Sequence, residues 1–502
     1  MLVRRAEAAL CRDGPPAGGL VDVRITGGVV TEIGPPGRRL ARRRGEDELD
    51  AAGGALLPGL HDHHIHLMSL AAAAASVVLG PPEISGPRDF ASRLRTAAAA
   101  ARTGTAGGWV RGVGYHPAVA GDLDRVALDA LTGDVPARVQ HRGGALWVLN
   151  SAGLRALGLG PESFLDVAGV ERTPDAVPTG RLWRLDGWLA GRVPRVPADL
   201  GAVGRAALAT GVTGFTDATP QRRPSDAAAL GDAVASGALP QRLTLMLPLD
   251  DGPGGSGEPG GPGEPGGAGG AAFPDRISPG PAKIMLDDMN LPSPDELARR
   301  VRRARRAGIP VAVHCVTRVQ LVVALAAIAA AGPPPPGGTD RIEHGAVVPP
   351  ELAALIGAAG LTVVTQPNFV AERGDAYLAE VDPDDLDWLY PCRSLLAAGI
   401  AVAGGTDAPF GHPDPWRAVR AARERRTASG RVLGPAERVD GRTALDLFLG
   451  RPDAPARPRR LHPGLPADLC LLRTPLDDAL ADPDAAHVAA TIIDGVLAHT
   501  AP

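Results

Sequence analysis

The sequence predicts an α/β protein whose main part is a (β/α)₈ TIM barrel, with a small β-sandwich domain built from both chain ends. Three observations support this fold class. Eight short apolar segments alternate with stretches that carry helix signatures. A hairpin pattern of alternating apolar and polar residues occurs near each end of the chain. Polar residues able to bind a metal follow several of the apolar segments, where a barrel places its catalytic groups.

The expected barrel strands are short and rich in aliphatic residues. The first lies within residues 57–67, and the others are expected at 212–216, 243–247, 282–286, 311–314, 341–344, 362–366 and 400–403. The clearest helix start is Ser293-Pro294-Asp295-Glu296, in which Ser293 is the N-cap and Glu296 completes a capping box. We expect the barrel to span residues 57–454, with an insertion at about 71–205.

The two chain ends predict one composite β domain, formed by residues 1–56 and 455–502. Residues 20–35 read as two strands around Gly27-Gly28, and residues 490–499 as two strands around Asp494-Gly495. Asp-Gly favours the type I′ turn of a tight hairpin. Residues 251–271 are almost purely Gly, Pro and Glu, a composition that cannot bury a core and predicts a disordered loop.

Composition excludes several classes of protein. The 502 residues carry a formal net charge of −4, which favours neither nucleic acid nor an anionic membrane as a partner. The apolar runs are too short to span a bilayer. The cysteines are far apart and form no C-x-x-C pair, so we expect a reducing cytoplasm: Cys11, Cys315, Cys392 and Cys470. A small-molecule substrate is the expected partner, and a homodimer is left open.

Four histidines and an aspartate crowd into residues 61–66. In a strand, His64 and His66 project from the same face, so that two imidazoles can bind one divalent metal. The alternative is a polar loop in which the histidines hydrogen-bond one another. His61 and His63 are not expected to bind metal.

Four further residues complete a candidate metal site. Lys283 lies in the fourth strand and is the only lysine, so arginine supplies every other one of the 52 Lys and Arg residues. Lysine offers a deprotonatable amine that arginine cannot. His314 and His344 end the fifth and sixth strands, and Asp407 follows the eighth. This N/O set suits Zn²⁺, and also Mn²⁺ or Fe²⁺.

The stretch Asp62-His63-His64-Ile65-His66 resembles the D-x-H-x-H signature of the amidohydrolase superfamily, and the four later residues follow in the family's order. Shorter matches resemble the branch of N-substituted formamide deformylases: Asn150-Ser151, Gly211-Val212-Thr213, Arg341-Ile342-Glu343-His344, Gln366-Pro367 and Thr406-Asp407-Ala408-Pro409. The chain differs from that branch after His314, at Asp288 and at Ala145. These are positions at which the substrate could be recognised.

The resemblance implies a site and a reaction. Lys283 would be carboxylated by CO₂ and bridge two ions, with His64, His66 and Asp407 on one ion and His314 and His344 on the other. Asp407 would be the general base, with Asp62 in a supporting role. The reaction implied is hydrolysis of a C–N bond in an amide, N-substituted formamide or cyclic amide by a metal-activated water. Alternatives are a deaminase or nonhydrolytic isomerase on the same scaffold, or a catalytically silent binding protein.

Overall fold

The computed structural model describes residues 1–12, 19–37, 40–103, 108–160, 166–195, 197–220, 222–249 and 275–502. The predicted loop at 251–271 lies outside these residues. The chain divides into two compact units, one formed by Met1–Leu67 with Leu200–Pro502 and the other by Met68–Asp199. Within the described ranges, no helix is long and apolar enough to cross a membrane.

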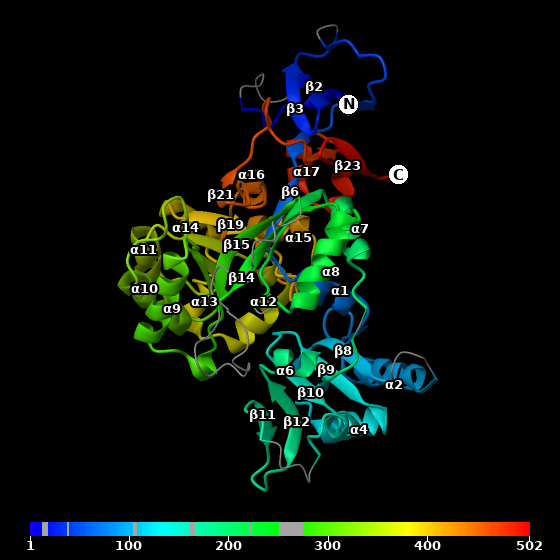
Figure 1. Cartoon of the computed structure of the whole chain (residues 1–502), viewed down its shortest axis with the longest axis vertical. Helices are drawn as coiled ribbons and strands as arrows, with labels where there is room; N and C mark the ends of the chain where they lie inside the picture. Colours follow the sequence, from blue (N-terminus) through cyan, green and yellow to red (C-terminus); the bar gives the residue numbers. More distant parts are fainter. Residues whose placement is uncertain are drawn as a thin grey trace. The chain divides into compact units, whose positions relative to one another are not determined.

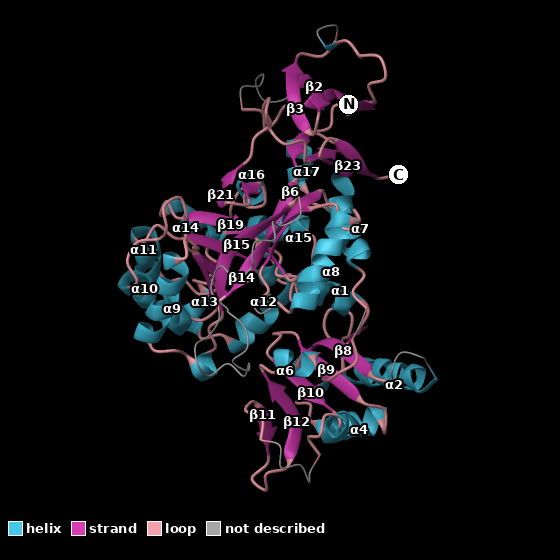
Figure 2. Cartoon of the chain, in the orientation of Figure 1, coloured by secondary structure: helices cyan, strands magenta, loops and turns pink. Residues whose placement is uncertain are grey.

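Eight parallel strands form the central sheet of the first unit and follow one another in sequence order (Figures 1 and 2). They are β6 (Leu60–Ile65), β13 (Val212–Asp217), β14 (Arg242–Pro248), β15 (Ile277–Ile284), β16 (Val311–Cys315), β17 (Arg341–His344), β18 (Thr362–Thr365) and β19 (Ala401–Gly404). The amide of Asp407, just after β19, donates to the carbonyl oxygen of His64 in β6 at 2.7 Å. This contact joins the two ends of the sheet, so the predicted (β/α)₈ barrel is confirmed.

Helices cover the outside of the barrel, as Figure 2 shows for α9, α10, α11 and α14. The helices of this unit are α7 (Leu200–Ala209), α8 (Pro224–Ala235), α9 (Pro294–Arg306), α10 (Arg318–Ala330), α11 (Pro350–Ala358), α12 (Asn368–Glu380), α13 (Pro383–Leu386), α14 (Cys392–Ala397), α15 (Pro415–Glu424), α16 (Gly441–Asp446) and α17 (Leu476–Ala481). Helix α1 (Leu67–Ala74) begins at the division, and all but its first residue belong to the second unit. The hydroxyl of Ser293 accepts a hydrogen bond from the amide of Glu296 at 3.3 Å, so Ser293 is the N-cap of α9.

Two strand boundaries differ from the sequence prediction. Strand β15 begins at Ile277, before the expected residue 282, because its pairing with β14 overrides the weak strand preference of Pro279 and Gly280. The stretch expected as the first barrel strand is divided at Gly59: β5 (Leu56–Pro58) pairs with β22 in another sheet, and only β6 enters the barrel. A side chain at Gly59 would lie 2.2 Å from Cγ2 of Thr213, so the chain passes closely between the two sheets there.

The chain ends form the small β-sandwich. One sheet has the order β3-β2-β1-β4 and the other β24-β23-β22-β5. The strands are β1 (Leu2–Glu7), β2 (Leu20–Thr26), β3 (Val29–Gly34), β4 (Glu48–Asp50), β22 (Leu469–Leu472), β23 (Val488–Ile493) and β24 (Val496–Thr500), with the short pair β20 (Gly450–Arg451) and β21 (Ala454–Pro458) leading to them. Apolar side chains of both ends, including Val23 and Leu469, share one buried core. The predicted union of the two ends is confirmed.

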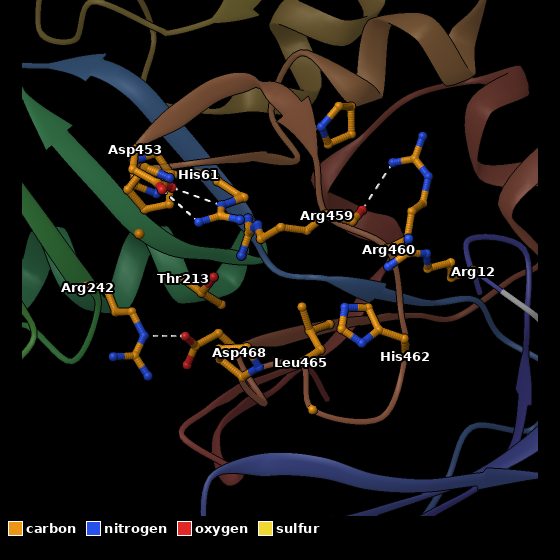
Figure 3. A pocket seen from close by; sticks show the side chains of 16 residues that line it. Arg12, His61, Thr213, Arg242, Asp453, Arg459, Arg460, His462, Leu465 and Asp468 are labelled. Atoms are coloured by element: carbon orange, nitrogen blue, oxygen red, sulfur yellow. Dashed lines mark hydrogen bonds and ion pairs between the residues drawn. The ribbon is translucent and has the colours of Figure 1, made fainter. Parts of the chain in front are cut away.

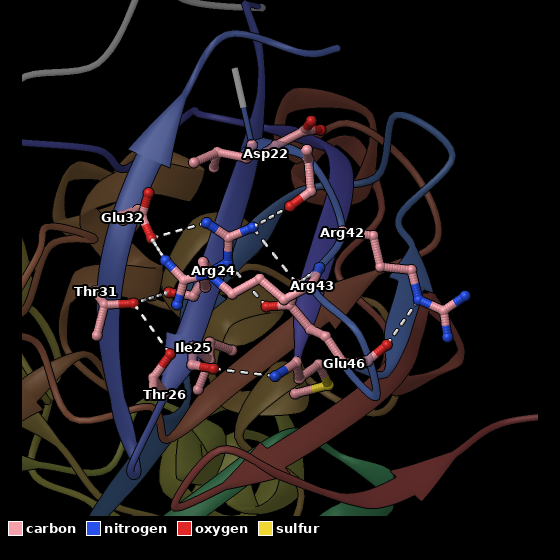
Figure 4. Close-up of polar contacts among 12 residues, drawn as sticks. Asp22, Arg24, Ile25, Thr26, Thr31, Glu32, Arg42, Arg43 and Glu46 are labelled. Atoms are coloured by element: carbon pink, nitrogen blue, oxygen red, sulfur yellow. Dashed lines mark hydrogen bonds and ion pairs between the residues drawn. The ribbon is translucent and has the colours of Figure 1, made fainter. Parts of the chain in front are cut away.

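A buried arginine holds the edge of this sandwich together. Arg24 is 3% exposed. Its guanidinium donates to Glu32 at 2.8 Å, to Glu46 at 2.9 Å and to the carbonyl oxygen of Ala41 at 2.6 Å (Figure 4). A buried charge is tolerated only when it is paired and hydrogen-bonded, and these contacts meet that requirement.

The second unit has its own sheet, with the order β11-β12-β10-β9-β8-β7. Its elements are β7 (Val77–Val78), α2 (Pro87–Thr103), β8 (Val110–Tyr115), α3 (Pro117–Ala120), α4 (Arg125–Thr132), β9 (Ala137–His141), β10 (Leu146–Leu149), α5 (Ser151–Ala156), β11 (Val170–Arg172), β12 (Pro178–Trp183) and α6 (Asp186–Ala190). Phe90, Leu94 and Leu128 of its helices pack on Val139 and Val148 of its strands, so the unit has a core of its own.

Candidate metal centre

The histidines in and just after strand β6 project from two opposite faces of the strand. His64 and His66 alternate with His61, His63 and Ile65, so the two sets leave the strand on opposite sides. Nε2 of His61 lies 2.9 Å from the hydroxyl of Thr216, and the rings of His61 and His63 are 4.5 Å apart. His64 is 1% exposed and His66 is partly exposed. The pair on the inner face is therefore the pair available to a ligand in the barrel.

Asp407 reaches the same place from the other end of the sheet. Its backbone adopts a left-handed conformation with φ of 55°, which turns the chain immediately after β19. Its carboxylate lies 3.2 Å from Nε2 of His66 and 3.5 Å from Nε2 of His64. One ligand atom from each of His64, His66 and Asp407 lies within 4.8 Å of the others. Two imidazoles and a carboxylate at this spacing fit a divalent ion.

The remaining histidines extend this cluster. The ring of His344 lies 4.8 Å from that of His64, and the ring of His314 lies 4.5 Å from that of His344. Nδ1 of His344 is 2.7 Å from the side-chain oxygen of Gln366, so its other ring nitrogen is the one left for a ligand. His344 also has a positive φ, 70°, which turns its side chain at the very end of β17.

Lys283 is the next-to-last residue of β15 and is 3% exposed. Among the described residues, its Nζ has no hydrogen-bond partner. Burial lowers the pKa of Lys283, and nearby Arg341 lowers it further, whereas Glu343 and Asp407 raise it. A buried ammonium without a hydrogen bond is costly, and a neutral amine is much less so. This orphaned nitrogen fits a site that holds a further group.

Burial also favours the neutral form of His64 and His344. It lowers the pKa of His64 well below the ordinary value, and the charge of Lys283 adds to the effect. Burial lowers the pKa of His344 as well. For Asp407, burial opposes ionisation, but the adjacent His66 and His64 together hold the pKa of the carboxyl well below its ordinary value. Neutral imidazoles and an ionised carboxylate are the forms that bind metal.

Sequence reasoning missed the groups that hold His64 in place. Nδ1 of His64 contacts a carboxylate oxygen of Glu343, whose other oxygen accepts from Nε of Arg341 at 2.7 Å. Arg341 also donates to the carbonyl oxygen of His63 at 2.9 Å. A carboxylate behind a histidine fixes its tautomer and orientation toward a metal. The sequence did contain one indication of this role: Arg341 and Glu343 are two charged residues in a buried strand, and buried charges require partners.

Asp62 supports the loop that carries Asp407. One carboxylate oxygen accepts from the amides of His64 at 3.1 Å and Thr406 at 3.0 Å, and the other accepts from the hydroxyl of Thr406. Burial raises the pKa of Asp62 to about 7, against the lowering effect of these hydrogen bonds. Asp62 therefore joins β6 to the segment after β19.

Comparison with known proteins agrees with this arrangement. N-substituted formamide deformylase of Arthrobacter pascens is 26% identical over 515 residues, covering 95% of this chain and 94% of that protein. An uncharacterized metal-dependent hydrolase from Pyrococcus horikoshii has the same fold, with a TM-score of 0.68 and 19% identity over 99% of each chain. A second one, from Pyrococcus furiosus, has a TM-score of 0.67 and 18% identity, covering 97% of this chain and 99% of its own.

The match to a family model is broader than any local motif. It spans residues 47–499 and therefore includes the whole barrel, the insertion and most of the C-terminal strands. The chain belongs to the amidohydrolase family and is a hydrolase that acts on carbon–nitrogen bonds.

Proposed function

We propose that this hydrolase cleaves the C–N bond of an amide, an N-substituted formamide or a cyclic amide at a centre held by His64, His66, Lys283, His314, His344 and Asp407. The observation that carries the proposal is the convergence of His64, His66 and Asp407 beside the buried amine of Lys283, for which the described residues offer no hydrogen-bond partner. The similarity to a formamide deformylase over nearly the whole chain supports the substrate class.

The residues present divide naturally into two ligand sets. His64, His66 and Asp407 would hold one ion, and His314 with His344 a second. Zn²⁺ is the proposed metal, because imidazole and carboxylate ligands suit it, and Mn²⁺ or Fe²⁺ are the other ions to test. When bound, the metal supplies a Lewis acid for the scissile carbonyl and lowers the pKa of a water molecule.

Lys283 is proposed to carry a carboxylate that bridges the two sets. A neutral amine adds to CO₂ to form a carbamate and releases one proton, and the lowered pKa of Lys283 favours the neutral amine. A carbamate would also give this buried side chain oxygen atoms that bind metal. Its amine nitrogen would no longer be an isolated charge.

Asp407 is the proposed general base. Its carboxylate lies against the imidazoles of His66 and His64, so it would lie beside a water molecule bound at this centre. Asp407 would accept a proton from that water and deliver it to the leaving nitrogen, which must be protonated before the C–N bond breaks. Glu343 would keep His64 oriented throughout.

A cytoplasmic location and a small-molecule substrate complete the proposal. The cysteines Cys11, Cys315, Cys392 and Cys470 are all free thiols, as a reducing compartment requires.

The proposal is tested by metal analysis followed by a substrate screen. The purified protein, loaded with Zn²⁺ or Mn²⁺, should hold one or two tightly bound ions and hydrolyse members of a panel of N-formyl, N-acyl and cyclic amides. Release of formate from an N-substituted formamide would identify the narrower class. A protein that binds no divalent ion tightly, even after loading, would overturn the metal centre. A metal-loaded protein that deaminates or isomerises substrates without amide hydrolysis would overturn the reaction.

A further inference from the structure

A second site lies at the other end of the barrel strands. A cavity of about 590 Å³ opens between the first residues of the barrel strands and the chain that leads to the C-terminal β strands. Its wall includes His61 of β6, Thr213 of β13 and Arg242 of β14, each at or next to the N-terminal end of its strand. The metal-binding residues lie at the opposite, C-terminal ends. A cavity of this volume is in the range of small-molecule sites.

The cavity is lined by an unusual number of arginines. Five arginines and two histidines line it, and Figure 3 labels all of them except Arg451: Arg12, Arg242, Arg451, Arg459, Arg460, His61 and His462. Of the described residues that line the same space, two are carboxylates, Asp453 and Asp468.

Three of these arginines are neutralised by carboxylates. Arg451 donates to Asp453 at 2.7 Å. Arg460 donates to Asp446 at 2.6 Å. Arg242 contacts Asp468 and also Asp494, which Arg276 shares from outside the cavity.

The other two arginines of the cavity are Arg12 and Arg459. Within the part of the chain that the structure describes, neither Arg12 nor Arg459 forms an ion pair. The guanidinium of Arg459 donates to the carbonyl oxygens of Leu449 and Gly59 instead. Burial lowers the pKa of Arg459 to about 10, although Asp468 nearby raises it. Arg459 is therefore a desolvated cation whose charge is compensated only at a distance. Arg12 lies exposed on the rim of the same space.

The chemistry of an occupant follows from this charge. Two guanidiniums without a direct ion pair among the described residues suit a phosphate monoester, which carries about −1.5 to −2 at neutral pH. Guanidinium N–H groups form charge-assisted hydrogen bonds with phosphate oxygens. In Arg459 the Nη1 group is the one to offer, since Nε and Nη2 donate to backbone carbonyls. The rest of the lining includes Pro452, Pro458, Leu465 and Pro466, which would contact an apolar substituent.

We propose that this cavity binds a phosphate-bearing small molecule, with Arg12 and Arg459 holding the phosphate and the proline-rich wall holding its substituent. The site is separate from the metal centre and does not rest on the proposed reaction. His61 lines the cavity three residues before His64 on the same strand, and a ligand bound there would stabilise the folded state that contains this strand.

The experiment uses the full-length, metal-loaded protein and two probes, inorganic phosphate and phenyl phosphate. The thermal unfolding midpoint is followed against probe concentration at constant ionic strength, with chloride making up the difference, and affinities are measured by titration calorimetry. We expect both probes to raise the midpoint above that in chloride, with phenyl phosphate binding more tightly. Arg12→Gln should weaken binding about tenfold, the loss expected for one charge-assisted hydrogen bond.

Arg12→Lys, which keeps the charge, should restore most of the affinity. Arg306→Gln is the matched control, because Arg306 is an exposed arginine on α9 outside the cavity. Phosphate bound at the metal centre would be unaffected by Arg12→Gln. An affinity equal in Arg12→Gln and Arg306→Gln, or midpoints equal in phosphate and chloride, would therefore overturn the proposal.

Discussion

Several residues of the centre are polar groups removed from water, and the group that compensates each one defines its role. His64 contacts Glu343, His344 contacts Gln366, and both are buried. Lys283 differs because its nitrogen finds no partner among the described residues. A folded protein rarely leaves such a group unsatisfied without a reason. A substitution of Lys283 is therefore the most direct test of the proposed metal centre.

Replacing Lys283 by arginine keeps a positive charge but removes the nucleophilic amine. We expect Lys283→Arg to lose most of its bound metal and to lower kcat by a factor of about 100 or more, because no carbamate can form. Metal content per chain and turnover are measured together, with circular dichroism to verify folding. Near-normal metal content in a folded variant would remove the bridging role. Depleting dissolved CO₂ during metal loading should reproduce part of the loss in the unaltered protein.

Replacing Asp407 by asparagine separates proton transfer from metal binding. The amide side chain of Asp407→Asn would keep the shape and one oxygen ligand, so the variant should retain most of its metal. Without a base, kcat should fall by a factor of about 10² to 10⁴. The measurement is turnover per bound ion, which corrects for any metal that is lost. Turnover per ion equal to that of the unaltered enzyme would assign the base to another residue.

Glu343 is expected to act through His64. Glu343→Gln keeps the size of the side chain but removes the charge that orients the imidazole, and metal affinity should fall about 10- to 100-fold. Glu437→Gln is the control, because Glu437 is also buried and accepts from Ser394 on α14 without contacting the proposed ligands. The two variants are compared by competition with a metal indicator. Equal affinities would mean that Glu343 is only a core residue.

At the scale of elements, the centre depends on how closely the first and last strands of the barrel approach. Gly405 follows β19, and a Cβ there would lie 2.6 Å from Cβ of His64 and 2.7 Å from its amide nitrogen. The hydrogen bonds from Asp407 to His64 and from His66 to Ala408 hold the same junction. The absence of a side chain at Gly405 is therefore what lets Asp407 reach the two histidines.

Gly405→Ala should open this junction. The clash involves backbone as well as a side chain, so we expect a loss of about 1 to 3 kcal/mol in the free energy of unfolding, together with weaker metal binding. Gly231→Ala is the contrasting variant, since a Cβ at Gly231 in helix α8 meets nothing within 4 Å and should be neutral or stabilise by about 0.5 to 1 kcal/mol. Chemical denaturation measures the free energy of unfolding of both variants. Equal free energies of unfolding would show that the two strands can move apart at this junction without loss of stability.

At the scale of the whole molecule, some features could be read from sequence and others could not. The barrel strands were recognisable because apolar runs end in polar residues, as at His344 and Asp407. The start of β15 was hidden, because Pro279 and Gly280 carry no strand signal and only pairing with β14 defines it. Glu343 and the arginine-lined cavity were missed for a related reason. His64 contacts Glu343, and Arg12 lines the same cavity as Arg459, although the members of each pair are hundreds of positions apart in the sequence. No local pattern records such pairs.

Removing the metal should destabilise the whole chain without unfolding it. A ligand that binds only the native state stabilises it by about 4 kcal/mol at 1,000 times its Kd, and that contribution is lost on chelation. The barrel core is made of apolar side chains such as Val313, Ile342 and Val363, so secondary structure should persist. We expect the stripped protein to unfold several degrees lower, with unchanged far-ultraviolet circular dichroism, and Zn²⁺ to restore the midpoint. Lys283→Arg, expected to hold little metal, should show a much smaller shift on chelation. A stripped protein with an unchanged midpoint would mean that the ion contributes nothing to the folded state, and a stripped protein that loses its helices would mean that the barrel forms only around the metal.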